Sequence, residues 1–246
     1  MQTNSVQRSS LTWHSSALTH VGYVREINED AYLDAREQGL WIVADGMGGH
    51  HAGDMASQMV VERLINFVPG DDLARNIDDI EDRLLGANRH CRKQSAGRRV
   101  MGTTAALLFA HEPFCFFLWV GDSRVYRLRD GTLTQVTEDH SLVQEMQTLG
   151  EISAAEAADH PSSNIITRAI GVREELFIDI EYSTIEPGDR FLLCSDGLYK
   201  DLSEGEITQQ LRDLPVEQST KNLVQLALDR GGNDNITAIV VQAEYA

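Results

Sequence analysis

Four aspartates stand where apolar, strand-like runs begin or end. They are Asp45 after LWIVA, Asp122 after FFLWVG, Asp196 after RFLLCS and Asp234 before NITAIVV. One aspartate at a strand end is most often a turn residue that hydrogen-bonds its own backbone. Four carboxylates brought together would repel one another unless a cation held them, and all-oxygen ligand sets select hard ions such as Mg²⁺ or Mn²⁺. The set therefore indicates a divalent-metal site, although no single member does.

A second polar cluster is VGYVREINEDAYLD, which starts at residue 21. It places Arg25, Asn28, Glu29 and Asp30 close together in the sequence. A solvated charged turn is the simplest interpretation. A planar guanidinium beside acidic metal ligands would, however, bind phosphate oxygens in a bidentate way. Arg25 is therefore a candidate phosphate-binding residue.

The loop ADGMGGHHAGD is rich in glycine. It is not a nucleotide-binding P-loop, because no Lys-Ser or Lys-Thr pair follows at the required spacing. The adjacent His50 and His51 would point apart on an extended chain and do not suit a joint zinc site. Small neighbours such as Gly46 leave room for a backbone carbonyl and waters beside Asp45.

The stretch HCRKQSAGR resembles the phosphate-wrapping loop of cysteine phosphatases. Those enzymes need a spacing one residue shorter than the six residues that separate Cys91 from Arg98. Cys91 also falls on the apolar face of a predicted helix. We therefore reject a cysteine nucleophile here.

The elements that must position these residues follow from hydrophobic periodicity. Helical spacing predicts two amphipathic helices, whose apolar faces are Met55, Met59, Val60, Leu64 and Phe67 in the first and Ile77, Ile80, Leu84, Ala87 and Cys91 in the second. Capping boxes predict shorter helices after Ser141 (with Gln144), Ser153 (with Glu156) and Ser203 (with Glu206).

Short apolar runs predict buried strands at 103–110 and 114–122 and a last strand at 235–243. Alternating residues on both sides of Asp130-Gly131 predict a hairpin. The runs 177–185 and 190–197 flank Pro187-Gly188-Asp189, and we expect them to pair with each other. Hairpins without strictly alternating βα units favour antiparallel sheet layered with helices, an α+β class, over a doubly wound parallel sheet.

Composition excludes several functions. The chain has 21 basic and 38 acidic residues and a net charge of −17, whereas nucleic acids and anionic membranes bind clustered Lys and Arg. The apolar run at 114–120 is too short to span a bilayer, and the polar N-terminal residues lack the apolar core of a signal peptide. Three widely spaced cysteines do not suit a disulfide framework. We expect a cytoplasmic monomer with no membrane insertion and no nucleic-acid partner.

Eight segments carry a family resemblance: REINED, DGMGGHHAG, GTTAA, VGDSRVYRLRDG, TEDHS, ITRAIG, LLCSDGL and GGNDNIT. In this order they resemble the motifs of bacterial PP2C-type (PPM) metal-dependent protein serine/threonine phosphatases, over nearly the whole chain. The resemblance implies a four-layer αββα sandwich of two antiparallel β-sheets flanked by helices. It also implies that residues 1–246 form a single catalytic domain.

The resemblance further implies a set of metal ligands for Mn²⁺ or Mg²⁺. Asp45 would bridge two ions, and the Gly46 carbonyl would bind one of them. Asp196 and Asp234 would hold the second ion. Asp122, together with Asp196, would hold a third and weaker one.

The remaining site residues would act around these ions. Glu29, Asp30 and Asn235 would act mostly through metal-bound water, and Arg25 would bind the substrate phosphate. A bridging water of lowered pKa would supply hydroxide for in-line attack on phosphorus, without a covalent phosphoenzyme. His50 is the candidate general acid for the leaving alkoxide, and His51 is an additional histidine. Residues 145–170 would form a flap beside the active site.

Two other functions stay open at this point. A degenerate phosphatase could serve as a binding or regulatory module, but such members lose metal-site aspartates, and Asp45, Asp196 and Asp234 are all present. A nucleotide or sugar phosphatase could be distinguished from a protein phosphatase only by a substrate assay. The resemblance implies phosphoprotein substrates and a partner Ser/Thr kinase that the enzyme opposes. Compact members also occur beside type VI secretion genes, which is one possible setting.

Overall fold

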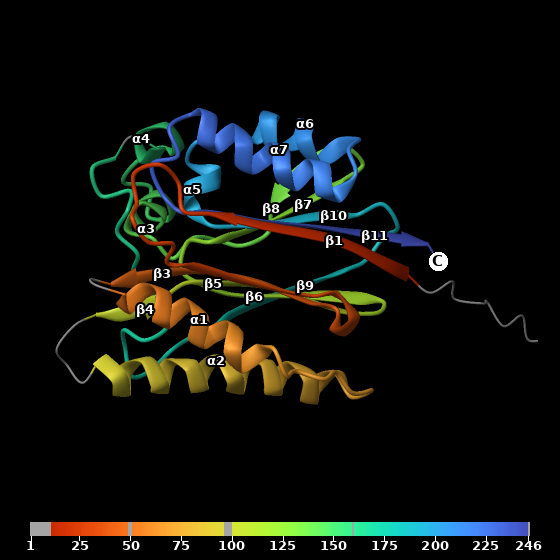
Figure 1. The fold of residues 1–246 in the computed structure, drawn as a ribbon, viewed down its shortest axis with the longest axis horizontal. Coiled ribbons are helices and arrows are strands. Elements are labelled where there is room, and N and C mark those ends of the chain that lie inside the picture. The colour runs from red at the N-terminus through yellow and green to blue at the C-terminus, as the bar shows by residue number, and fades with distance from the viewer. Residues whose placement is uncertain (1–10, 49–50, 96–99, 159, 246) are drawn as a thin grey trace, which may run out of the picture.

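Two antiparallel sheets lie face to face between layers of helices (Figure 1). The computed structural model describes residues 11–48, 51–95, 100–158 and 160–245. Sheet A contains, in spatial order, β1 (Leu11–His20), β11 (Ile236–Tyr245), β10 (Arg190–Cys194), β7 (Arg124–Arg129) and β8 (Thr132–Gln135). Sheet B contains β2 (Asp30–Ala35), β3 (Leu40–Gly48), β5 (Ala105–His111), β6 (Phe114–Val120) and β9 (Asp179–Thr184), and β4 (Met101–Thr103) pairs with the end of β3.

Helices cover the outer faces of both sheets (Figure 1). Sheet B is covered by α1 (Ala52–Leu64) and α2 (Leu73–Ser95). Sheet A is covered by α5 (Asp196–Tyr199), α6 (Glu204–Arg212) and α7 (Val216–Asp229). Two short helices, α3 (Leu142–Thr148) and α4 (Ala154–Ala158), lie at one end, and a 3-10 helix (Arg36–Gln38) joins β2 to β3. The predicted α+β sandwich is confirmed.

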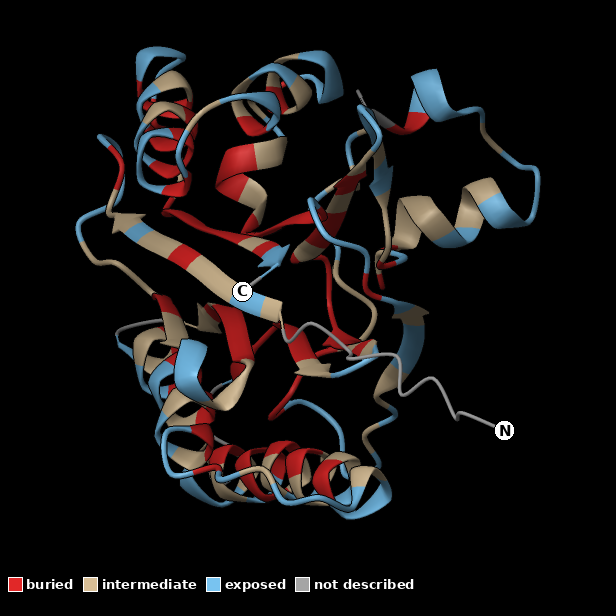
Figure 2. Cartoon of the chain, turned by 90° about the vertical axis from the view of Figure 1, so that its right-hand side faces the viewer, coloured by how far each residue is buried: buried red, intermediate tan, exposed pale blue. Residues whose placement is uncertain are grey.

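Apolar side chains between the sheets hold the two halves together. Trp41 of sheet B and Phe191 of sheet A both contact Trp13, with ring centroids 5.3 and 6.5 Å apart, respectively. Phe117 packs on Phe191 at 5.8 Å. Full burial of each such side chain contributes about 1.5–3 kcal/mol. Figure 2 shows buried residues concentrated in the strands and on the sides of the helices that pack against them.

Most local predictions are confirmed. The hairpin between β7 and β8 turns at Asp130 and Gly131, whose φ angles of 50° and 75° suit a tight two-residue turn. The Ser203–Glu206 capping box is complete. Met55 was wrongly placed on a buried face: it is 51% exposed. Phe67 is buried, but it follows α1 rather than belonging to it.

The predicted pairing of the runs 177–185 and 190–197 is wrong. β9 pairs with β6 in sheet B, whereas β10 pairs with β7 and β11 in sheet A. The turn between them crosses from one sheet to the other. Arg129 of β7 anchors it, with Nε and Nη2 2.7 and 2.6 Å from the two carboxylate oxygens of the buried Asp189. β10 is buried along its whole length and needs a neighbour on both edges, which the single partner β9 could not supply.

The helices of the described residues include no candidate for a membrane span. Across the described residues, no helix combines the length and the apolar character that crossing a bilayer requires.

Candidate metal centre

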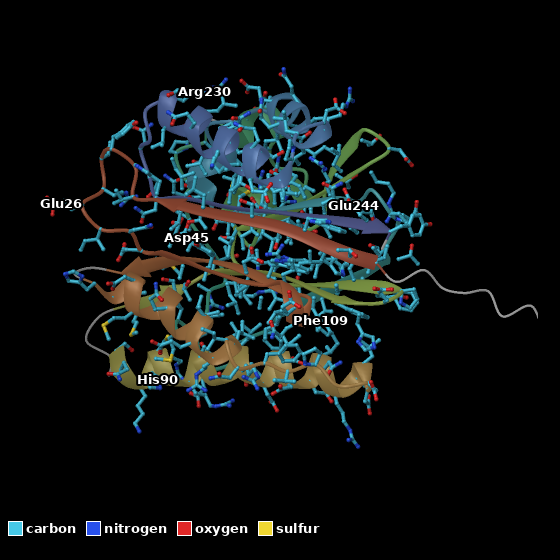
Figure 3. All side chains as sticks on the ribbon, turned by 45° about the vertical axis from the view of Figure 1, so that its right-hand side comes forward. Glu26, Asp45, His90, Phe109, Arg230 and Glu244 are labelled. Atoms are coloured by element: carbon cyan, nitrogen blue, oxygen red, sulfur yellow. The ribbon has the colours of Figure 1, made fainter. Side chains whose placement is uncertain are left out.

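The four predicted aspartates come in pairs from the two sheets. In sheet B, Asp45 belongs to β3, and Asp122 lies just after β6. In sheet A, Asp196 begins α5 directly after β10, and Asp234 precedes β11. Three of them, Asp45, Asp196 and Asp234, line a cleft of about 540 Å³ that Arg25 also lines. Asp45 points between the sheets, toward the end of the molecule where Glu26 lies (Figure 3).

Asp45 does not end its strand, contrary to the prediction. β3 continues to Gly48, because β4 pairs with Gly46–Gly48. The Asp45 amide donates a hydrogen bond to Thr104 Oγ1 at 2.9 Å, and the Asp45 carbonyl accepts hydrogen bonds from Thr103 Oγ1 and the Thr104 amide. Directly opposite on β2 stands Asp30. The sheet therefore fixes two carboxylates side by side.

Burial and neighbouring carboxylates raise the pKa of Asp45. Burial raises the pKa of Asp45 well above its usual value, and the charges of Asp30, Asp196, Asp122 and Asp234 raise it further, in that order. Mutual repulsion of this kind destabilises the ionised cluster unless cations neutralise it. The electrostatics therefore fit a site for divalent cations.

Two buried carboxylate oxygens lack a partner in the described part of the chain. Asp30 Oδ2 accepts hydrogen bonds from Ser195 Oγ at 2.7 Å and Thr237 Oγ1 at 2.6 Å, but Asp30 Oδ1 has no partner. Oδ1 of Asp122 is likewise buried and unpartnered. Burial raises the pKa of both side chains to about 7. Hard oxygen acceptors left unsatisfied in this way suit Mg²⁺ or Mn²⁺ and their bound waters.

Two cationic side chains pair with the other two aspartates. Arg25 Nη2 lies 2.7 Å from Asp234 Oδ2, and Lys200 Nζ lies 2.6 Å from Asp196 Oδ2. Among the described residues, no three His, Cys, Asp or Glu side chains already close around a single point as metal ligands do. Binding of a metal by Asp196 or Asp234 would therefore require each carboxylate to share or exchange its cationic partner.

Glu29 and Asn235 hold the loop that carries Arg25. The Asn235 side chain accepts a hydrogen bond from the Glu29 amide at 2.8 Å and donates to the carbonyls of Val21 and Ile27. Glu29 Oε1 accepts from the Gly53 amide at 3.2 Å, and burial raises the pKa of Glu29. Asn235 thus fixes the loop. Its predicted action through metal-bound water stays a prediction.

Gly46 lies where two backbone segments approach each other. A Cβ at this position would lie 2.2 Å from the carbonyl oxygen of Gly53 and 2.5 Å from that of Glu29. The Gly46 amide also donates to the Glu29 carbonyl at 3.1 Å. Backbone therefore fills the space on this side of Gly46, where the sequence led us to expect room for water.

We expect Gly46→Ala to destabilise the fold by about 3 kcal/mol or more, because the added methyl group must displace backbone. In a chain of this size, that loss lowers the melting temperature by roughly 6–12 °C. Gly205→Ala is the matched control, since the nearest contact of its Cβ to the described side chains is Ser203 Oγ at 4.0 Å and alanine suits a helix. Equal melting temperatures for the two variants would contradict the steric account.

The stability of the metal-free protein is expected to fall as the pH rises from about 5 to about 7. In the folded protein, Asp30 and Asp122 keep their protons up to about pH 7. The unfolded chain releases them near pH ~3.9. The folded state therefore binds more protons in this range, and the free energy of unfolding decreases as protons are lost.

Thermal melts of chelator-treated protein at several pH values measure this dependence. Asp30→Asn should flatten the slope, because asparagine does not titrate, and added Mn²⁺ should restore stability at the higher pH. A wild-type melting temperature with the same pH slope as Asp30→Asn would contradict the prediction.

Other predicted residues are placed as follows. His50 lies outside the described residues, so its role as general acid stays a prediction. His51 precedes α1 with a φ of 67°, and its Nδ1 lies 3.5 Å from Asp54 Oδ2. In the predicted flap, Asn164 and Ile166 line the cleft. Lys200 is a cleft residue that the sequence analysis missed, although its spacing of four residues from Asp196 at a helix start signals contact.

The chain belongs to the protein phosphatase 2C family, whose model matches residues 23–240. It is 39% identical over 238 residues to the serine/threonine protein phosphatase PstP of Mycobacterium tuberculosis, which covers 95% of this chain but 45% of PstP. The chain thus spans less than half of that relative. It is 36% identical over 237 residues to the protein phosphatase PhpP of Streptococcus pneumoniae, covering 92% and 96% of the two chains.

Solved structures agree with this assignment. PppA, described as a key regulatory component of T6SS in Pseudomonas aeruginosa, superposes with a TM-score of 0.88 at 42% identity, covering 95% of this chain and 100% of PppA. The catalytic domain of PstP in complex with two manganese ions superposes with a TM-score of 0.85 at 34% identity, covering 96% and 100%. The family resemblance predicted from the sequence is confirmed.

Proposed function

We propose that this chain is a divalent-metal-dependent phosphatase that hydrolyses phosphoserine and phosphothreonine in proteins. One observation carries the proposal: carboxylates from both sheets meet Arg25 at a single cleft, and two further buried carboxylate oxygens, on Asp30 and Asp122, have no partner among the described residues. Membership of the protein phosphatase 2C family supports the reaction class. The most economical ligand set is Asp45, the Gly46 carbonyl, Asp196 and Asp234.

The metal centre would supply a water of lowered pKa, so that hydroxide is available near neutral pH, and positive charge beside the phosphoryl oxygens. Asp45 and Asp30, held opposite each other on β3 and β2, would keep the ligands at fixed spacing. Arg25 would bind phosphate oxygens and stabilise the charge that develops on them. Its half-exposed side chain can turn from Asp234 toward a substrate, because 53% of its surface faces solvent.

A single assay tests the activity. Phosphate release from a phosphothreonine peptide should require added Mn²⁺ or Mg²⁺ and should stop on chelation. A nucleotide monophosphate and a sugar phosphate, assayed in parallel, should be much poorer substrates. Hydrolysis that survives chelation, or that prefers the small molecules, would contradict the proposal.

The similarity to PppA, described as a key regulatory component of T6SS, supports type VI secretion as the biological setting. Phosphoprotein substrates in turn imply a Ser/Thr kinase that the enzyme opposes. The segment 145–170 supplies Asn164 and Ile166 to the cleft, which supports a flap that contacts the substrate protein. Phosphoproteomics of a deletion strain would identify the substrates directly.

A further inference from the structure

Lys200 places a positive charge inside the carboxylate cluster. Its Nζ lies 2.6 Å from Asp196 Oδ2 and 2.7 Å from Asn164 Oδ1, and it lines the same cleft as Asp45. The side chain is 33% exposed, so most of it is covered. Lys200 therefore joins the short helix α5 to the segment 145–170 through one ammonium group.

The residue before Lys200 contacts Asp122: Tyr199 donates its hydroxyl to the Asp122 carbonyl at 3.0 Å. Asp122 is 2% exposed, its Oδ1 has no partner among the described residues, and the positive charge of Lys200 opposes the effect of burial on its pKa. In return, the charges of Asp196, Asp122 and Asp45 favour the protonated form of Lys200. Lys200 thus binds Asp196, one of the two carboxylates that family resemblance assigns to a third, weaker metal ion, and follows the residue that contacts the other, Asp122.

Lys200 leaves the core ligands usable. It engages Oδ2 of Asp196, whereas Oδ1 of Asp196 has no hydrogen bond to any described residue. Asp45 forms no ion pair with Lys200 and is held through its own backbone. A lysine here therefore does not prevent two ions from binding in the core.

We propose that Lys200 is a built-in cation that takes the place of the third divalent ion between Asp122 and Asp196. The proposal rests on the metal-dependent function proposed above. An ion entering between these aspartates must displace the ammonium or lie beside it, and like charges at such short range repel strongly. The wild-type protein therefore binds two ions tightly and a third only weakly.

Metal-binding stoichiometry tests this directly. The full chain, stripped of metal, is titrated with Mn²⁺ while free Mn²⁺ is followed by electron paramagnetic resonance. Lys200→Met removes the charge and keeps an unbranched side chain only one atom shorter, and it should tighten binding of the third ion by about tenfold or more. Lys200→Arg should behave as wild type. Lys221→Met is the matched control, because Lys221 is an exposed lysine on α7.

Asp122 provides a second arm. The double variant Lys200→Met with Asp122→Asn should lose the third ion again. Asp122→Asn alone, with Lys200 kept, should match the wild-type isotherm over the range of Mn²⁺ concentration that fills two sites. Loss of an ion from that range would overturn the proposal, as would an unchanged third site in Lys200→Met. If the wild type binds no Mn²⁺ at all, the proposed function itself fails.

Discussion

Asp45→Asn is expected to lower the Mn²⁺-dependent turnover of a phosphothreonine peptide by at least about a thousandfold, which corresponds to about 4 kcal/mol of transition-state stabilisation. The proposed bridging ligand loses a negative charge, so affinity for the core ions should fall with activity. The fold should survive, because the Asp45 backbone is held by Thr103 and Thr104 rather than by its carboxylate.

The thermal stability of the metal-free Asp45→Asn variant should increase, although its activity and its affinity for Mn²⁺ fall. Burial and four neighbouring carboxylates raise the pKa of Asp45, so removing its charge relieves repulsion. Without metal, the melting temperature should therefore rise, while added Mn²⁺ should stabilise the variant less than the wild type. A simple folding defect would lower both melting temperatures.

Calorimetric Mn²⁺ titration and thermal melts with and without Mn²⁺ separate these effects. Asp234→Ala should also lose activity and metal affinity, because it removes a proposed ligand of the second ion. Asp78→Ala is the control, since Asp78 is exposed on the outer helix α2. Full activity in Asp45→Asn would refute the proposed metal centre.

Arg25→Ala is expected to cause the second large loss of activity. We expect kcat/KM for the phosphothreonine peptide to fall about a hundredfold, or about 2.7 kcal/mol, mostly through KM, because the guanidinium binds ground-state phosphate as well as the transition state. Affinity for Mn²⁺ should stay the same or increase, because Asp234 Oδ2 loses its 2.7 Å ion pair and becomes available.

Arg25→Lys should recover only part of the activity, since an ammonium cannot form two parallel bonds to phosphate. Arg36→Ala, an exposed arginine in the 3-10 helix, should leave both constants unchanged. Weaker Mn²⁺ binding in Arg25→Ala would contradict the substrate-binding role and indicate that Arg25 organises the metal ligands instead.

Sequence patterns predicted the layers because these depend on local signals. Apolar runs of strand length, the Asp130-Gly131 turn and helical periodicity are each readable over a few residues. The motif order then placed Asp45, Asp196 and Asp234 together, and the structure brings all three to one cleft.

What the sequence missed depends on long-range pairing. Whether two neighbouring runs pair with each other or enter different sheets is decided by partners far along the chain, as β9 and β10 show. Asp30 facing Asp45 is a matter of strand register. The contact of Lys200 with both Asp196 and Asn164 requires the fold to bring residue 164 back to α5.

Asp30 also connects the two halves of the sandwich. It belongs to sheet B, yet its Oδ2 accepts hydrogen bonds from Ser195 and Thr237, which lie just after β10 and within β11 of sheet A. The proposed ligands are divided between the same two sheets. If these ligands hold two ions, the distance between the sheets would set the spacing of the ligands, and the tryptophan and phenylalanine side chains packed between the sheets would influence that spacing. Variation in those interior residues among related chains would adjust metal preference without altering a single ligand.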